Sequence, residues 1–234
     1  YFQSQRNDLY VEAAMKLLVT GAKGQLGNDL VTQLEAAGFT AVSFSSAELD
    51  ISDLAAVLEA VKKAKPGIII NPAAYTKVDL AEKEKDRAYA VNANGAENLA
   101  LAAKEAGCPI VHVSTDFVFD GRSPVPCVEE AGTNPLSVYG ASKLAGENLV
   151  ANATDAHVIV RTSWLYGTTG HNFVKTILRL ASERDSLRIV YDQTGTPTWS
   201  ADLATAIVVI CKAIEAGKKP WGMYHYSNEG VASW

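Results

Sequence analysis

The chain has 234 residues and a formal net charge of −5 at pH 7, with 48% hydrophobic and 20% charged residues. These values are ordinary for a globular protein and exclude a disordered tail, a collagen-like repeat and a small disulfide scaffold. The acidic balance disfavours nucleic acid as a partner, because binding phosphates requires basic side chains. No apolar run approaches the roughly 18 residues of a transmembrane helix, so no membrane partner is expected.

The cysteines and histidines show no metal or disulfide pattern. Cys108, Cys127 and Cys211 lie far apart and form no CxxC pair. This spacing is not that of a disulfide framework or a zinc site, and it favours reduced thiols in a cytoplasmic protein. The four histidines are scattered without the spacing of metal ligands, so we expect no metal site among them.

The first residues do not look like part of the fold. Residues 1–4 (YFQS) resemble the remnant of a cleaved purification tag, and no clear period is visible up to residue 14. We therefore treat residues 1–14 as a tag scar and leader, and expect the native start at Met15.

Short apolar runs then alternate with amphipathic helical patterns. Strands are predicted at 16–20, 40–44, 68–70, 109–114, 157–162 and 187–190. Helices are predicted from Leu26 to Gly38, over 54–61 behind an Asp53 cap, over 81–106 as one helix or two that break near 92–95, and over 142–151, 173–181 and 202–216. This alternation is typical of an α/β fold with a Rossmann-type, doubly wound parallel sheet.

The elements suggest one large domain and a smaller lobe. We assign residues 15–163 to a dinucleotide-binding Rossmann domain. Residues 164–234 are expected to form a mixed segment that contributes to a small substrate lobe and returns to the Rossmann sheet. The Pro- and Gly-rich stretch 121–135 is longer than most connections, which favours a functional loop.

A glycine-rich loop follows the first predicted strand and opens the first helix. Its sequence is GAKGQLG, with Gly21, Gly24 and Gly27 spaced three apart. The glycines allow a tight turn, close approach of the backbone to a pyrophosphate and close packing of helix on sheet. Free amides and the positive end of the helix dipole would then face the phosphates. The loop therefore predicts a dinucleotide site.

The adenosine side of this site is less well defined. The second predicted strand ends in Ser43-Phe44-Ser45-Ser46, without an acid for a ribose 2′-hydroxyl or an arginine for a 2′-phosphate. Small hydroxyls accept either group, so we favour NADPH and leave NADH open. Further on, Asp50 could accept a hydrogen bond from the adenine amino group while Ile51 packs on the ring.

A YxxxK pattern at Tyr139 and Lys143 points to proton transfer. In a helix the two side chains lie on one face, one turn apart. A nearby ammonium favours the phenolate and would lower the pKa of Tyr139 from about 10 by roughly 1–3, which suits a general acid toward a carbonyl oxygen. Thr115 directly follows the fourth predicted strand, at the edge where open α/β sheets bind ligands, and its hydroxyl could bond the substrate carbonyl and Tyr139.

These residues resemble the extended short-chain dehydrogenase/reductase superfamily and, within it, the dTDP-4-dehydrorhamnose reductase family. The resemblance runs from Met15 to Trp234. Its motifs are GAKGQLG (21–27), ELDISD (48–53), NPAAYTKVDLAE (71–82), VNANGAENLA (91–100), STDFVFDG (114–121), NPLSVYGASKLAGE (134–147), RTSWLYG (161–167), NF (172–173) and DQTGTPT (192–198).

The resemblance implies that a hydride passes from NADPH, or NADH, to the C4 keto carbon of a dTDP-6-deoxyhexulose, while Tyr139 gives a proton to the oxygen. The implied catalytic residues are Thr115, Tyr139 and Lys143. The implied cofactor-binding residues are Gly21, Gly24, Gln25, Leu26, Gly27, Asp50, Ile51, Ala73, Ala74, Tyr75, Val113, Tyr139 and Lys143. The implied substrate-binding residues are Val78, Thr115, Asp116, Trp164 and Asn172. A homodimer and Mg²⁺ also come with the resemblance, although no acidic ligand set in this chain supports the ion.

The chain departs from the family pattern in three ways. Phe117 stands where the family usually has Tyr, and Cys127 where an aromatic residue follows Pro. The family also continues for several tens of residues beyond an SW-like motif, so we expect part of the substrate lobe to be missing after Trp234.

Other functions on the same fold remain alternatives. A nucleotide-sugar dehydratase needs an Asp-Glu pair after the strand-end Thr, whereas this chain has Asp116-Phe117. An epimerase is harder to exclude, but RTSWLYG and AAYTKVD favour the reductase. A regulatory subunit that keeps the cofactor fold is the non-enzymatic alternative, and the intact set of Thr115, Tyr139 and Lys143 disfavours it.

Overall fold

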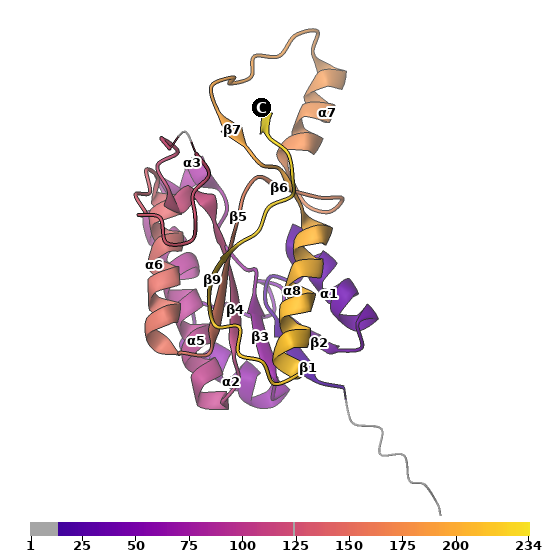
Figure 1. The fold of residues 1–234 in the computed structure, drawn as a ribbon, viewed down its shortest axis with the longest axis vertical. Helices are drawn as coiled ribbons and strands as arrows, with labels where there is room; N and C mark the ends of the chain where they lie inside the picture. The colour runs from indigo at the N-terminus through magenta and orange to yellow at the C-terminus, as the bar shows by residue number, and fades with distance from the viewer. Residues whose placement is uncertain (1–13, 124) are drawn as a thin grey trace, which may run out of the picture.

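A six-stranded parallel sheet forms the centre of the computed structural model, which describes residues 14–123 and 125–234. The expected tag scar and leader therefore lie, except for residue 14, outside the described residues. The strand order is β2-β1-β3-β4-β5-β9, and Figure 1 shows the helices on both faces. The strands are β1 Lys16–Val19, β2 Thr40–Ser43, β3 Ile68–Asn71, β4 Ile110–Thr115, β5 His157–Thr162 and β9 Gly222–His225.

The doubly wound, Rossmann-type sheet predicted from the sequence is confirmed. Its strand order reverses between β1 and β3, because β2 lies on one side of β1 and the later strands continue on the other. Ligands of open α/β sheets bind at such a switch point, outside the carboxyl ends of the strands. The loops after β1 and β3 are thus the expected position for a dinucleotide.

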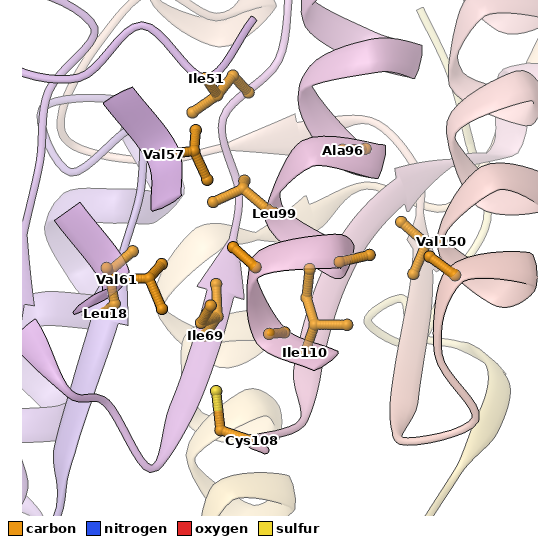
Figure 2. Close-up of a cluster of buried hydrophobic side chains, with 14 of the residues drawn as sticks. Leu18, Ile51, Val57, Val61, Ile69, Ala96, Leu99, Cys108, Ile110 and Val150 are labelled. Atoms are coloured by element: carbon orange, nitrogen blue, oxygen red, sulfur yellow. The ribbon is translucent and has the colours of Figure 1, made fainter. Parts of the chain in front are cut away.

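Two apolar clusters hold helices against the sheet, because successive strand residues point to opposite faces. On one face, Leu17 and Val19 pack with α1 (Gln25–Ala36) and α8 (Ser200–Glu215). On the other, Leu18 packs with α2 (Leu54–Ala64), α5 (Gly95–Ala106) and α6 (Val138–Ala153). Figure 2 shows this second cluster, in which Leu99 of α5 lies near Val57 of α2. Each fully buried Leu or Ile contributes about 1.5–3 kcal/mol.

Side-chain caps explain where several helices begin. Asp53 accepts from the amides of Ala55 and Ala56 at the start of α2, as predicted. Ser137 accepts from the amide of Gly140, so α6 begins at Val138, four residues before the predicted start at 142. This earlier start brings Tyr139 into the first turn of the helix.

The region predicted as helix over 81–106 is helical but irregular. Short helices α3 (Val78–Ala81) and α4 (Lys85–Tyr89) precede a π-helical turn at Ala90–Asn94, which leads directly into α5. The helix therefore does not break near 92–95 but widens there. The π turn places Asn92 in the interior, where its side-chain amide bonds both the N–H and the carbonyl of Tyr75 at 2.8 and 3.1 Å.

A small lobe lies beyond the carboxyl edge of the sheet (Figure 1). It contains β6 (Leu165–Tyr166) paired with β8 (Thr198–Trp199), β7 (Thr194–Gly195) paired with β10 (Ala232–Ser233), and α7 (Phe173–Glu183). The strand predicted at 187–190 is wrong: these residues form no strand, and Ile189 and Val190 are 40% and 54% exposed. Among the described residues, none of the helices has the length and apolar character needed to span a bilayer.

Candidate active site

The glycine loop takes the conformation that its spacing predicts. Gly21 has φ +57°, a left-handed conformation that favours glycine. A Cβ on Gly21 would lie 2.9 Å from the Cα of Ala73, in the loop after β3. A Cβ on Gly27 would overlap the Gly21 carbonyl oxygen. The loops after β1 and β3 therefore meet closely at the switch point, and only glycines permit that approach.

The start of α1 offers unpaired amides to an anion. Its cap residue, Gly24, provides no side-chain hydrogen bond. Within the described residues, the amides of Gln25, Leu26 and Gly27 donate to no other group. First-turn amides without a protein partner and the positive end of the helix dipole suit a pyrophosphate. These residues therefore fit a dinucleotide.

The loop after β3 borders the same edge through Ala73 and Ala74. Tyr75 is anchored rather than free, since it is 8% exposed and its hydroxyl donates to Glu84 at 3.0 Å. Burial, assisted by Glu84, raises the pKa of Tyr75 above its usual value. Tyr75 can therefore shape the wall of a cofactor site but offers little ring surface to it.

The adenosine end differs from the sequence prediction in the position of Ile51. Ile51 is 5% exposed and packs in the core under α5, which leaves little of its side chain for an adenine ring. Asp50 accepts from the amide and hydroxyl of Ser52 at 2.9 and 2.7 Å. These bonds hold the pKa of Asp50 below its usual value, so its carboxylate remains an acceptor.

Sequence reasoning missed Glu48 at this end. Its carboxylate accepts from the amide and hydroxyl of Ser45, at 2.8 and 2.6 Å, directly after β2. These bonds, with a smaller contribution from the charge of Lys23, lower the pKa of Glu48. An acidic side chain therefore does lie beside the end of β2, although it comes three residues after Ser45 in the sequence.

Thr115 and Tyr139 meet at the carboxyl edge of β4. Thr115 and Asp116 act on the pKa of the Tyr139 phenol in opposite directions, and Phe117 packs edge-on against the Tyr139 ring, with ring centroids 5.5 Å apart. Asp116 follows directly, with its Oδ1 3.1 Å from the Thr115 hydroxyl. Burial raises the pKa of Asp116 to about 6. Thr115, Asp116 and Tyr139 thus form one group of polar side chains at this edge.

Tyr139 and Lys143 lie one turn apart in α6, as their spacing predicts, but the Lys143 ammonium contacts β4. Its Nζ donates to the Val113 carbonyl at 2.7 Å and lies 3.3 Å from Nε2 of His112. Burial lowers the pKa of Lys143 to about 8, against an opposing effect of Glu147. Burial, with a smaller contribution from the charge of Asp116, raises the pKa of Tyr139 to about 12, and the opposing effect of Thr115 offsets only part of this. The expected lowering of the Tyr139 pKa by Lys143 is therefore wrong for this arrangement, because burial raises that pKa and the Lys143 charge is not among the causes that act on it.

Two of the predicted substrate residues, Trp164 and Asn172, lie in the small lobe. Trp164 has φ +45° and stacks on Trp234 with ring centroids 3.7 Å apart. Asn172 caps α7 and donates to the Gln25 side chain and to the Gly167 carbonyl, both at 2.8 Å. Val78 begins α3. An apolar cavity of about 250 Å³ lies in this lobe, lined by Trp164, Leu165, Tyr166, Phe173, Val174, Pro197, Ala232, Ser233 and Trp234.

Two more polar residues beneath the site were not assigned from the sequence. Asn92 also donates to the Ser142 hydroxyl at 3.0 Å and so connects the Tyr75 loop to α6. His112 was interpreted as a structural residue, but it contacts Lys143. Only their long-range contacts reveal them. Among the described residues, no group of three His, Cys, Asp or Glu side chains is arranged to hold a metal ion.

Fold and site together define a class: a Rossmann-type protein that joins a glycine loop to a Thr-Tyr-Lys set, as short-chain dehydrogenases/reductases do. The family model described as "RmlD substrate binding domain" matches residues 15–234, and the chain belongs to this family.

Relatives at about 40% identity carry reductase names. The chain is 43% identical to a dTDP-4-dehydrorhamnose reductase of Sinorhizobium fredii over 222 residues, which is 94% of this chain and 75% of the relative. It is 40% identical to a dTDP-4-keto-6-deoxy-D-glucose reductase of Streptomyces niveus, over 93% of this chain and 74% of the relative. A crystal structure of dTDP-4-dehydrorhamnose reductase from Bacillus anthracis, in complex with NADP, superposes with a TM-score of 0.88 at 45% identity, covering 94% and 77% of the two chains.

Proposed function

We propose that this protein uses NADPH to reduce the 4-keto group of dTDP-4-dehydro-6-deoxy-L-mannose, giving dTDP-L-rhamnose. The observation that carries the proposal is the meeting of Thr115, Asp116 and Tyr139 at the carboxyl edge of β4, on the same sheet edge as the glycine loop. The substrate class is supported by the names of relatives that are more than 40% identical to this chain over 94% of its length. The NADP of the Bacillus anthracis structure supports the cofactor.

The chain's own residues divide the work of a ketone reduction. The amides of Gln25, Leu26 and Gly27 would hold the pyrophosphate, and the nicotinamide, when bound, supplies a hydride to C4. Tyr139 donates its phenolic proton to the oxygen that gains charge, and Thr115 donates a hydrogen bond to the same oxygen. A pKa of about 12 keeps Tyr139 protonated at neutral pH, which a proton donor requires.

Three finer expectations belong to the same proposal. NADH remains open as a second cofactor, because Glu48 beside Ser45 suits a ribose 2′-hydroxyl. A cytoplasmic location agrees with three free thiols, Cys108, Cys127 and Cys211. A homodimer is expected from the resemblance alone.

The test is NADPH oxidation on dTDP-4-dehydro-6-deoxy-L-mannose, followed by absorbance and by identification of the product sugar. We expect Tyr139→Phe to lower kcat by about 10²–10⁴, the usual contribution of general acid catalysis. Tyr191→Phe is the matched control, because Tyr191 is 87% exposed and outside the site. An unchanged rate in folded Tyr139→Phe contradicts the assigned proton donor. Preference for the D-gluco ketosugar over the L-manno one would change the substrate and leave the reaction class intact.

A further inference from the structure

A row of buried polar side chains runs from β1 to α6 and ends on Lys143. Thr20 follows β1, Asn71 ends β3, and His112 lies in β4, on the strand next to β3. Thr20 and Lys143 are 1% exposed, and Asn71 and His112 are fully buried. Because buried donors and acceptors must pair with one another, each contact in this row restricts the next.

Asn71 has only one orientation that satisfies its neighbours. Its Oδ1 accepts from the Thr20 hydroxyl at 2.6 Å and from the Ala73 amide at 3.2 Å. The Ala73 amide can only donate, so the oxygen must be the atom that faces it. The Nδ2 group therefore faces Nδ1 of His112, at 3.1 Å. Since Nδ2 also only donates, Nδ1 of His112 must accept and carries no proton.

This result fixes the tautomer of His112. Burial, together with the charge of Lys143, holds the pKa of His112 well below its usual value, so the ring is neutral. A neutral imidazole carries one proton, which must then be on Nε2. Nε2 lies 3.3 Å from Nζ of Lys143. An ammonium only donates, so two donors would oppose each other there. A neutral amine instead accepts from Nε2–H and still donates to the Val113 carbonyl at 2.7 Å.

We propose that His112 is a positioning residue that restrains the protonation of Lys143. By presenting Nε2–H to Nζ, His112 favours the neutral amine, and Asn71 fixes the tautomer that makes this possible. The consequence for the reaction, which is the pH range in which Lys143 is charged during catalysis, rests on the proposed function. The tautomer of His112 and the protonation equilibrium of Lys143 do not depend on that function.

Other charged groups around Lys143 act in both directions. The lowered pKa of Lys143 arises mainly from burial, and Glu147, one turn further along α6, opposes it. Glu147 is itself paired with Arg161 of β5 at 2.7 Å, which reduces its pull on Lys143. Contacts link Lys143 to His112 of β4 and, through Glu147 of α6, to Arg161 of β5, while Tyr139 lies one turn earlier in α6 and interacts with Asp116.

Nuclear magnetic resonance of the ligand-free full chain tests the proposal. With ¹⁵N-labelled histidine, we expect one imidazole ring that does not titrate in the neutral range and that carries its proton on Nε2. The signals of this ring should be absent from the spectrum of His112→Gln. With labelled lysine, the signal missing from Lys143→Arg should titrate near pH 8. His112→Gln should raise this pKa by about 1 or more, because an amide oxygen can accept from the ammonium. His157→Gln is the matched control and should leave it unchanged, since His157 bonds the Thr154 carbonyl instead.

A proton on Nδ1 of His112 in the unaltered protein would overturn the proposal. An unmoved Lys143 pKa in folded His112→Gln would do the same, because a merely structural histidine would give that result. If His112→Gln does not fold, the tautomer and the Lys143 titration in the unaltered protein decide. Absence of ketosugar reduction together with the Nε2–H tautomer would refute the proposed function and leave this inference standing.

Discussion

Replacing Glu147 with Ala should destabilise the protein strongly, because it breaks a buried ion pair. Arg161 donates from Nε and Nη2 to the two Glu147 oxygens at 2.9 and 2.7 Å. The side chains are only 6% and 2% exposed. Without Glu147, the guanidinium keeps the Glu129 carbonyl at 3.3 Å and the face of Phe119 at 5.2 Å. Removing one partner of such a pair costs about 3–5 kcal/mol, since a buried charge remains uncompensated.

The pair of Arg179 and Glu183 on α7 provides a matched control. Its N–O distance is 2.8 Å, close to that of the buried pair, but its side chains are 60% and 49% exposed. Glu183→Ala should therefore cost less than about 1 kcal/mol. Urea unfolding with unchanged slope measures both differences. At about 2–4 °C per kcal/mol for a chain of this size, Tm should fall by about 6–20 °C for Glu147→Ala and by under about 4 °C for the control.

A double variant separates the lost attraction from the unpaired charge. Glu147→Ala with Arg161→Leu removes the guanidinium as well, so it should be more stable than Glu147→Ala alone. Equal losses for Glu147→Ala and Glu183→Ala would refute the reasoning, because distance and not burial would then decide the energy. A double variant no more stable than Glu147→Ala would refute the part assigned to the uncompensated charge.

Two further predictions concern the cofactor loop and the reaction edge. Gly27→Ala should weaken dinucleotide binding by about tenfold or more, because its Cβ would overlap the Gly21 carbonyl oxygen. Gly132→Ala is the control and should bind the dinucleotide with unchanged affinity, because the space around its Cβ is open. Fluorescence titration with NADPH compares the two variants, and equal affinities would contradict the role assigned to Gly27. Burial raises the pKa of Asp116 in the folded protein to about 6. The contribution of Asp116 to stability is therefore fully present below the pKa of about 3.9 that it has in the unfolded chain, and it is lost as the pH rises through about 6. Asp116→Asn should therefore gain stability relative to the unaltered protein at pH 8 but not at pH 4, and an equal gain at both would contradict the assigned cause.

Local patterns predicted most of the Rossmann sheet and the glycine loop. The strand at 68–70 lies in an apolar run that is buried on both faces, which is how central parallel strands read in a sequence. The conformation of Gly21 follows from a tight turn between strand and helix. Such features depend on residues near one another in the chain, so the sequence suffices to predict them.

The features that the sequence did not reveal concern contacts between distant residues. The run at 187–190 has the composition of a strand, but a strand needs a partner, and the sequence does not indicate whether one exists. Ile51 occupies a position expected to contact ligand, yet Asn98 of α5 donates to its carbonyl at 2.9 Å and helps to hold it in the core. Trp164 was expected to face a sugar or base, and Trp234, 70 residues later, stacks on its ring. No local periodicity in the sequence indicates these contacts.

The Tyr139–Lys143 pair shows why a spacing argument can identify the right residues and predict the wrong electrostatics. The spacing considers one charge acting on one phenol, whereas in the folded site burial acts on the pKa of both groups. Desolvation favours the neutral form of each, so the pKa of Tyr139 rises to about 12 while that of Lys143 falls to about 8. At pH 7 a phenol with that pKa is ionised to only about one part in 10⁵. Tyr139 is therefore poised to give a proton rather than to take one, as ketone reduction requires. Any change in rate between pH 7 and 9 should then come from Lys143 and not from the phenol.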